Sequence, residues 1–251
     1  MKFFLLIKRF FAVLVTLLHG EEKCICCSLP VLYEPLCPEC KKKLENQIIL
    51  WKTKPHCKIC GKPLISEDKE FSLCMACRLT PVLLSADSVV PLFTYRLWKK
   101  QLLFDWKMAS KRALSQVFAS FVNLALNEIL SFRHDDVLIV PVPPRPGKIR
   151  KTGWDQIDEL CKILKMQYKW KVKSLLCRLS YSQQKKKDRT ERLKTSGSAY
   201  ALKRKMPENF PENIVLIDDV ITTGATVESC SALLKAKTNS KITVLSLFIV
   251  D

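Results

Sequence analysis

The sequence lacks an apolar run long enough to cross a bilayer. The longest apolar run near the N-terminus covers residues 10–18, behind Lys8 and Arg9, whereas a membrane-spanning helix needs about 20 residues. No small-residue cleavage site such as A-x-A follows it, which disfavours a cleaved signal peptide but leaves it as an alternative. We therefore expect residues 1–20 to form an apolar helix that packs on the body or associates with a membrane face, in a cytoplasmic protein with no transmembrane span.

Acidic residues are few relative to basic ones. Asp and Glu number 24 against 42 Lys and Arg, which gives a formal net charge of +18. The charge stays strongly positive even if eight cysteines bind two zinc ions as thiolates. Such an excess favours a polyanionic partner, whether nucleic acid, nucleotide or anionic membrane, without identifying which.

Residues 20–80 lack long apolar runs and contain five prolines, so they are typical of loops and short hairpins. Such a segment cannot fill a core by itself, and a bound metal is expected to replace one. Nine of the twelve cysteines fall in the first third of the chain, mostly as Cys-x-x-Cys pairs. These pairs are too close for easy internal disulfides and suit tetrahedral metal coordination better.

The cysteines form two quartets with zinc-site spacing. The first is Cys24, Cys27, Cys37 and Cys40, and the second is Cys57, Cys60, Cys74 and Cys77. Each quartet would hold one Zn²⁺ through four sulfurs at about 2.3 Å. With no open coordination position, both ions would be structural, and they fit a reducing compartment. Cys26 would be a spare thiol and His56 a solvated neighbour. A set of unrelated buried thiols is the alternative.

From residue 85 onward, strand patterns and helix patterns alternate. Short apolar runs at residues 88–95, 135–144, 213–217 and 241–250 are typical of buried parallel strands. Helical periodicity covers residues 97–106, 114–126 and 154–166, and a further helix reaches residue 235. This order predicts an α/β fold with a mainly parallel sheet covered by helices on both faces. We divide the chain into an apolar helix (1–20), a double zinc ribbon (21–82) and an α/β domain (83–251).

Two carboxylates follow the apolar run at residues 214–217. Asp218 and Asp219 are expected at the carboxyl end of a parallel strand, the edge of an open sheet where ligands bind. The next residues predict a tight turn into a helix, whose free N–H groups, hydroxyls and positive dipole end suit a phosphate; they are Thr222, Thr223, Gly224, Ala225 and Thr226. Because carboxylates accept hydrogen bonds from ribose hydroxyls, a sugar phosphate would satisfy both halves. The alternative is a threonine that only caps the helix.

The stretch VLIDDVITTGAT resembles the phosphoribosyl pyrophosphate (PRPP) motif of type I phosphoribosyltransferases. Together with the double zinc ribbon, nearly the whole chain is similar to the ComF family. The stretch PVPPRPGKIRKTGWDQ is similar to the pyrophosphate-side loop of that family. A later basic segment, CRLSYSQQKKKDRTERLKTSGSAY, is also similar, with Arg178, Gln184, Arg192 and Tyr200 at family-like positions.

The resemblance implies a type I phosphoribosyltransferase-like parallel sheet flanked by helices, behind a small N-terminal zinc-ribbon module. It implies that Asp218 and Asp219 hold the ribose hydroxyls, as the catalytic residues of an active enzyme. It further implies that Thr222, Thr223, Gly224, Ala225 and Thr226 hold the 5′-phosphate. Arg145 and Lys148 would face the pyrophosphate, with Mg²⁺ bridging its oxygens and the sugar.

The chain departs from the family pattern at three positions. Thr152 stands where the family usually has arginine, and Asp155 and Thr195 stand where asparagine is usual. A carboxylate at position 155 would repel pyrophosphate unless Lys151 or a metal offsets its charge.

Two functions are open. The resemblance implies a ComF-like protein of DNA uptake in natural transformation (competence), with single-stranded DNA or a helicase-like protein as partner. Trp98, Trp106 and Trp154 lie among lysines and could stack on bases, although aromatic residues more often pack in a core or at its rim. The alternative is an active phosphoribosyltransferase of nucleotide salvage that releases pyrophosphate from PRPP. Residues 185–187 and Arg189 would then belong to a lid, unless they are a solvated charge run. No sequence feature names an acceptor base.

Overall fold

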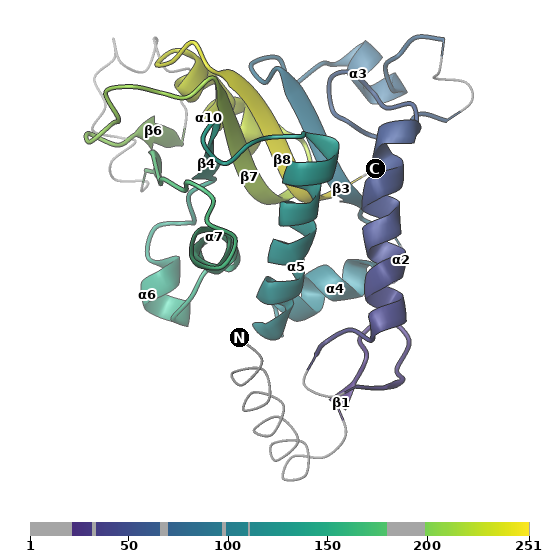
Figure 1. Ribbon diagram of the computed structural model, residues 1–251. Helices are drawn as coiled ribbons and strands as arrows, with labels where there is room; N and C mark the ends of the chain where they lie inside the picture. The colour runs from purple at the N-terminus through teal and green to yellow at the C-terminus, as the bar shows by residue number, and fades with distance from the viewer. Residues whose placement is uncertain are drawn as a thin grey trace.

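The computed structural model describes residues 22–31, 34–65, 70–96, 99–109, 111–179 and 199–250. Its centre is a parallel sheet with the strand order β3-β8-β7-β4 (Figure 1). The strands are β3 (Ser88–Thr94), β8 (Lys241–Ile249), β7 (Asn213–Ile221) and β4 (Val137–Pro141). This sheet, flanked by helices, confirms the predicted α/β class. The expected N-terminal helix 1–20 lies outside the described residues.

Side chains along β7 alternate between two hydrophobic cores. Val215 and Ile217 belong to the core on one face of the sheet, and Ile214 and Leu216 belong to the core on the other. Successive residues of a strand point to opposite faces, so a strand covered on both sides has a continuous apolar sequence. All four side chains are fully buried.

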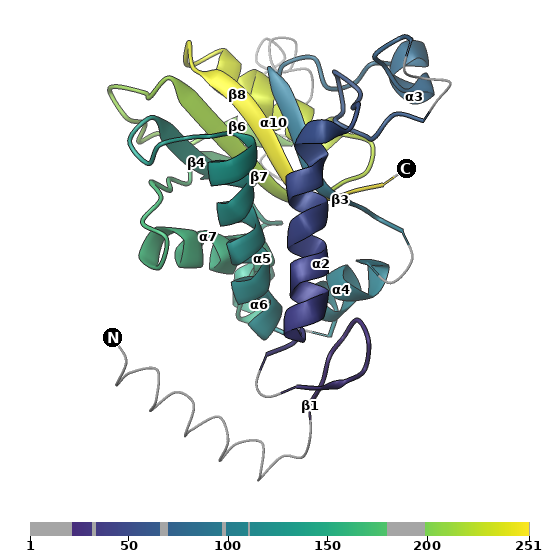
Figure 2. The ribbon, with the colours of Figure 1, turned by 45° about the vertical axis from the view of Figure 1, so that its right-hand side comes forward.

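Four helices contribute to the first core, and Figures 1 and 2 show them on the same side of the sheet. They are α2 (Pro38–Ile49), α4 (Lys99–Lys107), α5 (Ala113–Leu124) and α7 (Gln156–Met166). α5 continues into a π-helical turn, Ala125–Ile129. The apolar residues that recur at helical spacing along α5 and into this turn form one buried face; it comprises Leu114, Val117, Phe118, Phe121, Val122 and Ala125.

The second core lies between the sheet, α10 (Ala225–Lys235) and an antiparallel hairpin. The hairpin consists of β5 (Leu176–Arg178) and β6 (Tyr200–Leu202), which pair residue by residue. A short helix, α6 (Lys148–Thr152), follows the end of β4. Within the ranges given above, no helix is long and apolar enough to traverse a membrane.

The cysteine-rich segment runs along the body of the protein. It contains β1 (Glu22–Lys23), β2 (Pro30–Val31), α2, the 3₁₀ helix η1 (Leu50–Thr53) and α3 (Met75–Leu79). In Figure 2, α2 stands beside α5, with β1 below one of its ends and α3 beyond the other. Leu44 and Ile48 of α2 are fully buried in the same core as α5, so this helix is part of the main packing.

Several elements differ in extent from the sequence expectation, and the differences at β7 and α7 bear on the site. β7 continues through Asp218 and Asp219 to Ile221, because β8 is equally long and pairs with it as far as Ile221 and Ile249. α7 begins at Gln156, two residues later than expected. Its start is set by Asp155, whose side chain accepts hydrogen bonds from the N–H groups of Ile157 and Asp158.

Candidate functional site

A cleft of about 510 Å³ lies at the carboxyl ends of β4 and β7. It brings together five of the residues predicted for the site, namely Arg145, Lys148, Asp218, Asp219 and Thr226. The first two follow β4, the aspartates belong to β7, and Thr226 lies in the first turn of α10. Residues up to 81 positions apart in sequence therefore meet at the edge where open parallel sheets bind their ligands.

The two adjacent carboxylates have different surroundings. The Asp219 N–H donates to Asp218 Oδ1 at 2.8 Å, and Lys107 Nζ donates to Asp219 Oδ2 at 2.7 Å. Burial, and secondarily the neighbouring charge of Asp219, raise the pKa of Asp218 to about 8. This shift favours the protonated form of Asp218, which can donate as well as accept a hydrogen bond, whereas Asp219 is held by an ammonium group.

Lys107 was not predicted as a site residue. It belongs to α4, 112 positions before its partner, and nothing in its local sequence distinguishes it from the other lysines of the chain. Gln156 and Ile157, at the start of α7, also line the cleft. They are placed there by the fold, because α7 starts beside Lys148, the first residue of α6, which donates a hydrogen bond to Gln156 Oε1.

Lys148 and Asp155, which both line the cleft, form an ion pair. Lys148 Nζ lies 2.6 Å from Asp155 Oδ2 and also donates to Gln156 Oε1. The sequence suggested Lys151 or a metal as the group that offsets Asp155, and the structure gives this role to Lys148. Thr152 does not line the cleft, and its hydroxyl lies 2.9 Å from the main-chain oxygens of both Lys148 and Trp154, to either of which it can donate its single proton.

The predicted phosphate turn is divided between two cavities. Thr226 lines the main cleft, while Thr222, Thr223 and Gly224 line a second cavity of about 390 Å³ beside Cys60, Cys74 and Cys77. Ala225, the first residue of α10, lines neither cavity, and its N–H donates to Thr223 Oγ1 at 3.4 Å.

Gly224 occupies a position that suits glycine alone. Its φ of 83° is left-handed, and a Cβ there would lie 2.9 Å from Leu83 Cδ2. Glu228, one turn into α10, accepts hydrogen bonds from the Leu84 and Ser85 N–H groups at 2.8 and 3.0 Å. The turn is therefore clamped to the segment that follows the second cysteine quartet.

Arg178 and Tyr200 complete the rim of the cleft. They face each other across the β5–β6 hairpin, with the Arg178 guanidinium 5.4 Å from the Tyr200 ring centroid. The Tyr200 hydroxyl donates to Thr226 Oγ1 at 3.4 Å, which ties the hairpin to the first turn of α10. Residues 180–198 of the predicted basic segment, among them Gln184, residues 185–187, Arg189, Arg192 and Thr195, lie outside the described residues.

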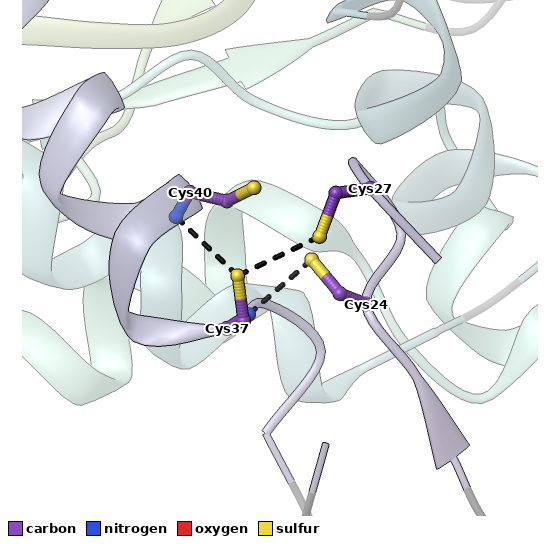
Figure 3. Close-up of side chains that lie close together, drawn as sticks. All are labelled: Cys24, Cys27, Cys37 and Cys40. Carbon is purple, nitrogen blue, oxygen red and sulfur yellow. Dashed lines mark hydrogen bonds between the residues drawn. The ribbon is translucent and has the colours of Figure 1, made fainter. Parts of the chain in front are cut away.

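The first cysteine quartet is assembled as predicted (Figure 3). The Sγ atoms of Cys24, Cys27, Cys37 and Cys40 all lie within 4.8 Å of one another, and those of Cys27 and Cys37 are 3.6 Å apart. A tetrahedron with Zn–S bonds of about 2.3 Å has edges of about 3.8 Å. Burial opposes ionisation of Cys24, but the N–H groups of Cys37, Cys27 and Cys26 outweigh it and lower its pKa to about 6. This donor set fits a structural zinc ion.

The second quartet, Cys57, Cys60, Cys74 and Cys77, is entirely buried and meets the same distance criterion. The Sγ atoms of Cys60 and Cys74 are 3.7 Å apart. The two-zinc prediction therefore fits the structure, with four thiols for each ion.

Two residues beside the quartets, Cys26 and His56, are not part of either thiol cluster. Cys26 belongs to neither set, and burial, followed by the charges of Cys24 and Cys27, raises its pKa to about 12. The sequence suggested that His56 is a solvated neighbour of Cys57, and the structure differs. Its ring stacks on Trp51 with centroids 4.2 Å apart, and its Nε2 is sealed from solvent.

The predicted base-stacking tryptophans fall into different environments. Trp106 is fully buried and donates to Ser115 Oγ, so it is a core residue. Trp154 is partly exposed, with the Arg112 guanidinium 5.7 Å from its ring centroid. Trp98 lies outside the described residues.

Comparison with known proteins gives matches over most of the chain. No protein-family model matches it. It is 27% identical over 209 residues to the competence protein ComFC of Bacillus subtilis (strain 168), covering 81% of this chain and 79% of that protein. It is 26% identical over 219 residues to the competence protein ComFC of Streptococcus pneumoniae (strain ATCC BAA-255 / R6), covering 87% and 84%. These matches and the two cysteine quartets confirm the resemblance to the ComF family.

Proposed function

We propose that this ComF-like chain is a competence-related protein whose cleft binds a phosphoribosyl ligand of the PRPP class. The observation that supports the site is that the Asp218–Asp219 pair, the first turn of α10, and the cationic side chains of Arg145 and Lys148 all line one cavity of about 510 Å³. These are the groups that ribose hydroxyls, a 5′-phosphate and a second phosphate group would each require.

In this proposal, Asp218 and Asp219 receive the ribose hydroxyls, the neutral acid as donor or acceptor and the carboxylate as acceptor. Thr226 and the free N–H groups at the start of α10 hold the 5′-phosphate, with the positive end of the helix dipole. Arg145, which also lines the cleft, would contact a diphosphate at C1.

Magnesium in this proposal arrives with the ligand. Among the described residues, no group of three carboxylate or imidazole ligands surrounds the cleft, and the two thiol quartets are the metal-type clusters found. Mg²⁺ is commonly bound through one or two carboxylates and substrate phosphates. When bound, it would neutralise part of the diphosphate charge, while Asp219 offers a carboxylate near the sugar.

The binding site is tested by calorimetry with PRPP and Mg²⁺, and with ribose 5-phosphate, on the zinc-loaded full chain. We expect heat from the native protein and its loss in Asp218→Asn with Asp219→Asn. Asp135→Asn with Asp136→Asn is the matched control, because it changes an adjacent aspartate pair just before β4, at the opposite edge of the sheet. Absence of heat with either ligand in every protein would refute the proposed site.

The proposal includes a role in DNA uptake, with single-stranded DNA or a helicase-like protein as partner. The names of the two ComFC relatives support the competence role, and the net charge of +18 favours a polyanionic partner. Phosphate contacts make such binding fall steeply with salt. We expect single-stranded DNA to bind at low ionic strength and to weaken by orders of magnitude between about 50 and 200 mM salt. Affinity that is absent, or independent of salt, would count against this partner.

A second candidate function is phosphoribosyl transfer. The raised pKa of Asp218, about 8, favours it, because strongly perturbed carboxyls in clefts are typical of functional sites. Release of pyrophosphate from PRPP in the presence of free bases, abolished by Asp218→Asn, would establish this activity. PRPP binding without turnover over a panel of bases would restrict the cleft to a binding role.

A further inference from the structure

The second cysteine quartet and the 222–226 turn share a cavity. This cavity, of about 390 Å³, is lined by three thiols of the quartet and by three residues of the turn, Thr222, Thr223 and Gly224. Among the residues that the structure describes, no cysteine of the first quartet lines this cavity or the main cleft. The two quartets therefore differ in their relation to the candidate ligand site.

The two quartets also belong to different hydrophobic cores. Cys24 and Cys37 of the first quartet pack in the core that contains α2 and α5. All four cysteines of the second quartet pack in the core on the other face of the sheet, together with Val227 and Leu234 of α10. Because protein interiors are densely packed, a displacement of the second quartet is transmitted to the helix that begins at the turn.

Two direct contacts connect the turn to the chain that leaves the second quartet. Leu83, six residues after the last cysteine, covers Gly224 so closely that a Cβ on this glycine would lie 2.9 Å from Leu83 Cδ2. Glu228 accepts hydrogen bonds from the N–H groups of Leu84 and Ser85 at 2.8 and 3.0 Å. The position of the turn thus depends on where this short segment is held.

The quartet itself is anchored on the sheet. Gly61 follows Cys60 with a left-handed φ of 71°, and a Cβ at this position would overlap the main-chain oxygen of Val89 in β3. A metal ion bound by four thiols would join this turn of the chain to Cys74 and Cys77 at α3. It would thereby hold the segment after α3 at a fixed place relative to the sheet.

We propose that zinc binding by the second quartet and ligand binding by the 222–226 turn are coupled, so that each raises the affinity for the other. This inference rests on the proposed function. Without the metal, residues 57–77 lack the long apolar runs that would hold them in place. The segment that covers the turn is then released, and the N–H groups of the turn lose the arrangement that suits a 5′-phosphate. By thermodynamic linkage, the two effects are equal in size.

Two matched variants test which quartet is coupled to the ligand. Cys37 and Cys74 each begin the second pair of their quartet and occupy the N-cap of a helix, α2 or α3, with φ of −69° and −70°. Serine is a good N-cap but not a usual zinc ligand, so Cys37→Ser and Cys74→Ser should each keep the helix and lose one zinc ion.

The first measurement is calorimetry with ribose 5-phosphate, or with PRPP and Mg²⁺ if only PRPP binds. We expect Cys74→Ser to weaken ligand binding about tenfold relative to the native protein, a size typical of coupled sites. The ligand should bind Cys37→Ser at least about fivefold more tightly than it binds Cys74→Ser.

Zinc affinity supplies a measurement that can be made on the native protein. Equilibrium competition with a chelator should show that saturating ligand raises the affinity of one zinc site about tenfold and that of the other by less than about twofold. The ion that remains in Cys37→Ser should respond to the ligand, and the ion that remains in Cys74→Ser should not. Leu83→Ala, with both quartets intact, should reduce the response, because it removes the side chain that covers Gly224.

The inference and the proposed function fail in different ways. If the ligand binds the native protein but raises the affinity of both zinc sites equally, or of neither, the inference is wrong and the phosphoribosyl site stands. The same conclusion follows if Cys37→Ser weakens ligand binding as much as Cys74→Ser does. If neither ribose 5-phosphate nor PRPP binds the native protein, the proposed site itself is wrong.

Discussion

Replacing Glu228 by alanine should loosen the attachment of the 222–226 turn to the cysteine-rich segment. Glu228 Oε2 accepts from the Leu84 and Ser85 N–H groups at 2.8 and 3.0 Å, and Oε1 accepts from Ser85 Oγ at 2.6 Å. These contacts join residues 143 and 144 positions apart. They are the direct hydrogen bonds between the first turn of α10 and the segment after the second quartet.

The expected loss in the free energy of unfolding follows from the three hydrogen bonds to Glu228 and from how exposed their donors are. A hydrogen bond to a charged group contributes about 1.5–3 kcal/mol. Leu84 is 68% exposed, so water replaces part of what its N–H group loses. Loss of an acidic group from the first helical turn adds about 0.3–1 kcal/mol. We therefore expect Glu228→Ala to lower the free energy of unfolding by about 2–3 kcal/mol, and the melting temperature by roughly 4–10 °C for a chain of this size.

The assay is urea unfolding of the zinc-loaded protein, followed by circular dichroism. Glu212→Ala is the matched control, since Glu212 is an exposed partner of Lys241 at 3.4 Å, and such surface pairs contribute about 0–1 kcal/mol. A Glu228→Ala variant that loses no more stability than Glu212→Ala would refute the proposed clamp.

Three other changes have defined outcomes. The pKa of Asp218 in the folded state (about 8) exceeds its ordinary value of 3.8, so between these pH values the folded state holds a proton that the unfolded state has lost, and the free energy of unfolding should fall as pH rises. Urea unfolding should show that Asp218→Asn flattens this slope between pH 6 and 8. Equal slopes in the native protein and the variant would contradict the assignment. Gly224→Ala should lose about 1 kcal/mol more than Gly153→Ala in the same assay, because both have a left-handed φ but only Gly224 adjoins a side chain, Leu83; equal losses would show that Leu83 yields freely. Metal analysis should give two zinc ions per chain, still two in Cys26→Ser and one in Cys37→Ser, whereas one zinc ion in the native protein would overturn the two-quartet assignment.

Several features of the site could be predicted from local sequence. The cysteine spacings predict both quartets, since four thiols near one metal need only two close pairs that face each other. The apolar run before Asp218 predicts a buried parallel strand, and the position of the aspartates near its carboxyl end predicts their place at the ligand edge. Both kinds of signal depend on neighbours in the chain.

The remaining features depend on contacts between distant segments. Lys107 reaches Asp219 from a helix 112 positions earlier, and the partner of Asp155 is Lys148 rather than Lys151. The pairing of Asp155 with Lys148 depends on Gly153, whose left-handed φ of 78° ends α6 and turns the chain back towards the start of that helix. The division of the 222–226 turn between two cavities likewise depends on Leu83, which covers Gly224. None of these is encoded by local periodicity.

The place of β3 in the sheet affects how the chain can fold as it is synthesised. β3 pairs with β8, the last strand, and Ser88 meets Thr243 across a separation of 155 residues. At about 5–20 residues per second, ribosomal synthesis leaves β3 waiting for roughly 8–30 s. The two zinc sites lie upstream of β3 and need no residue beyond Cys77. Metal capture could therefore order the nascent N-terminal segment, and limit its aggregation, well before the strand that completes the sheet exists.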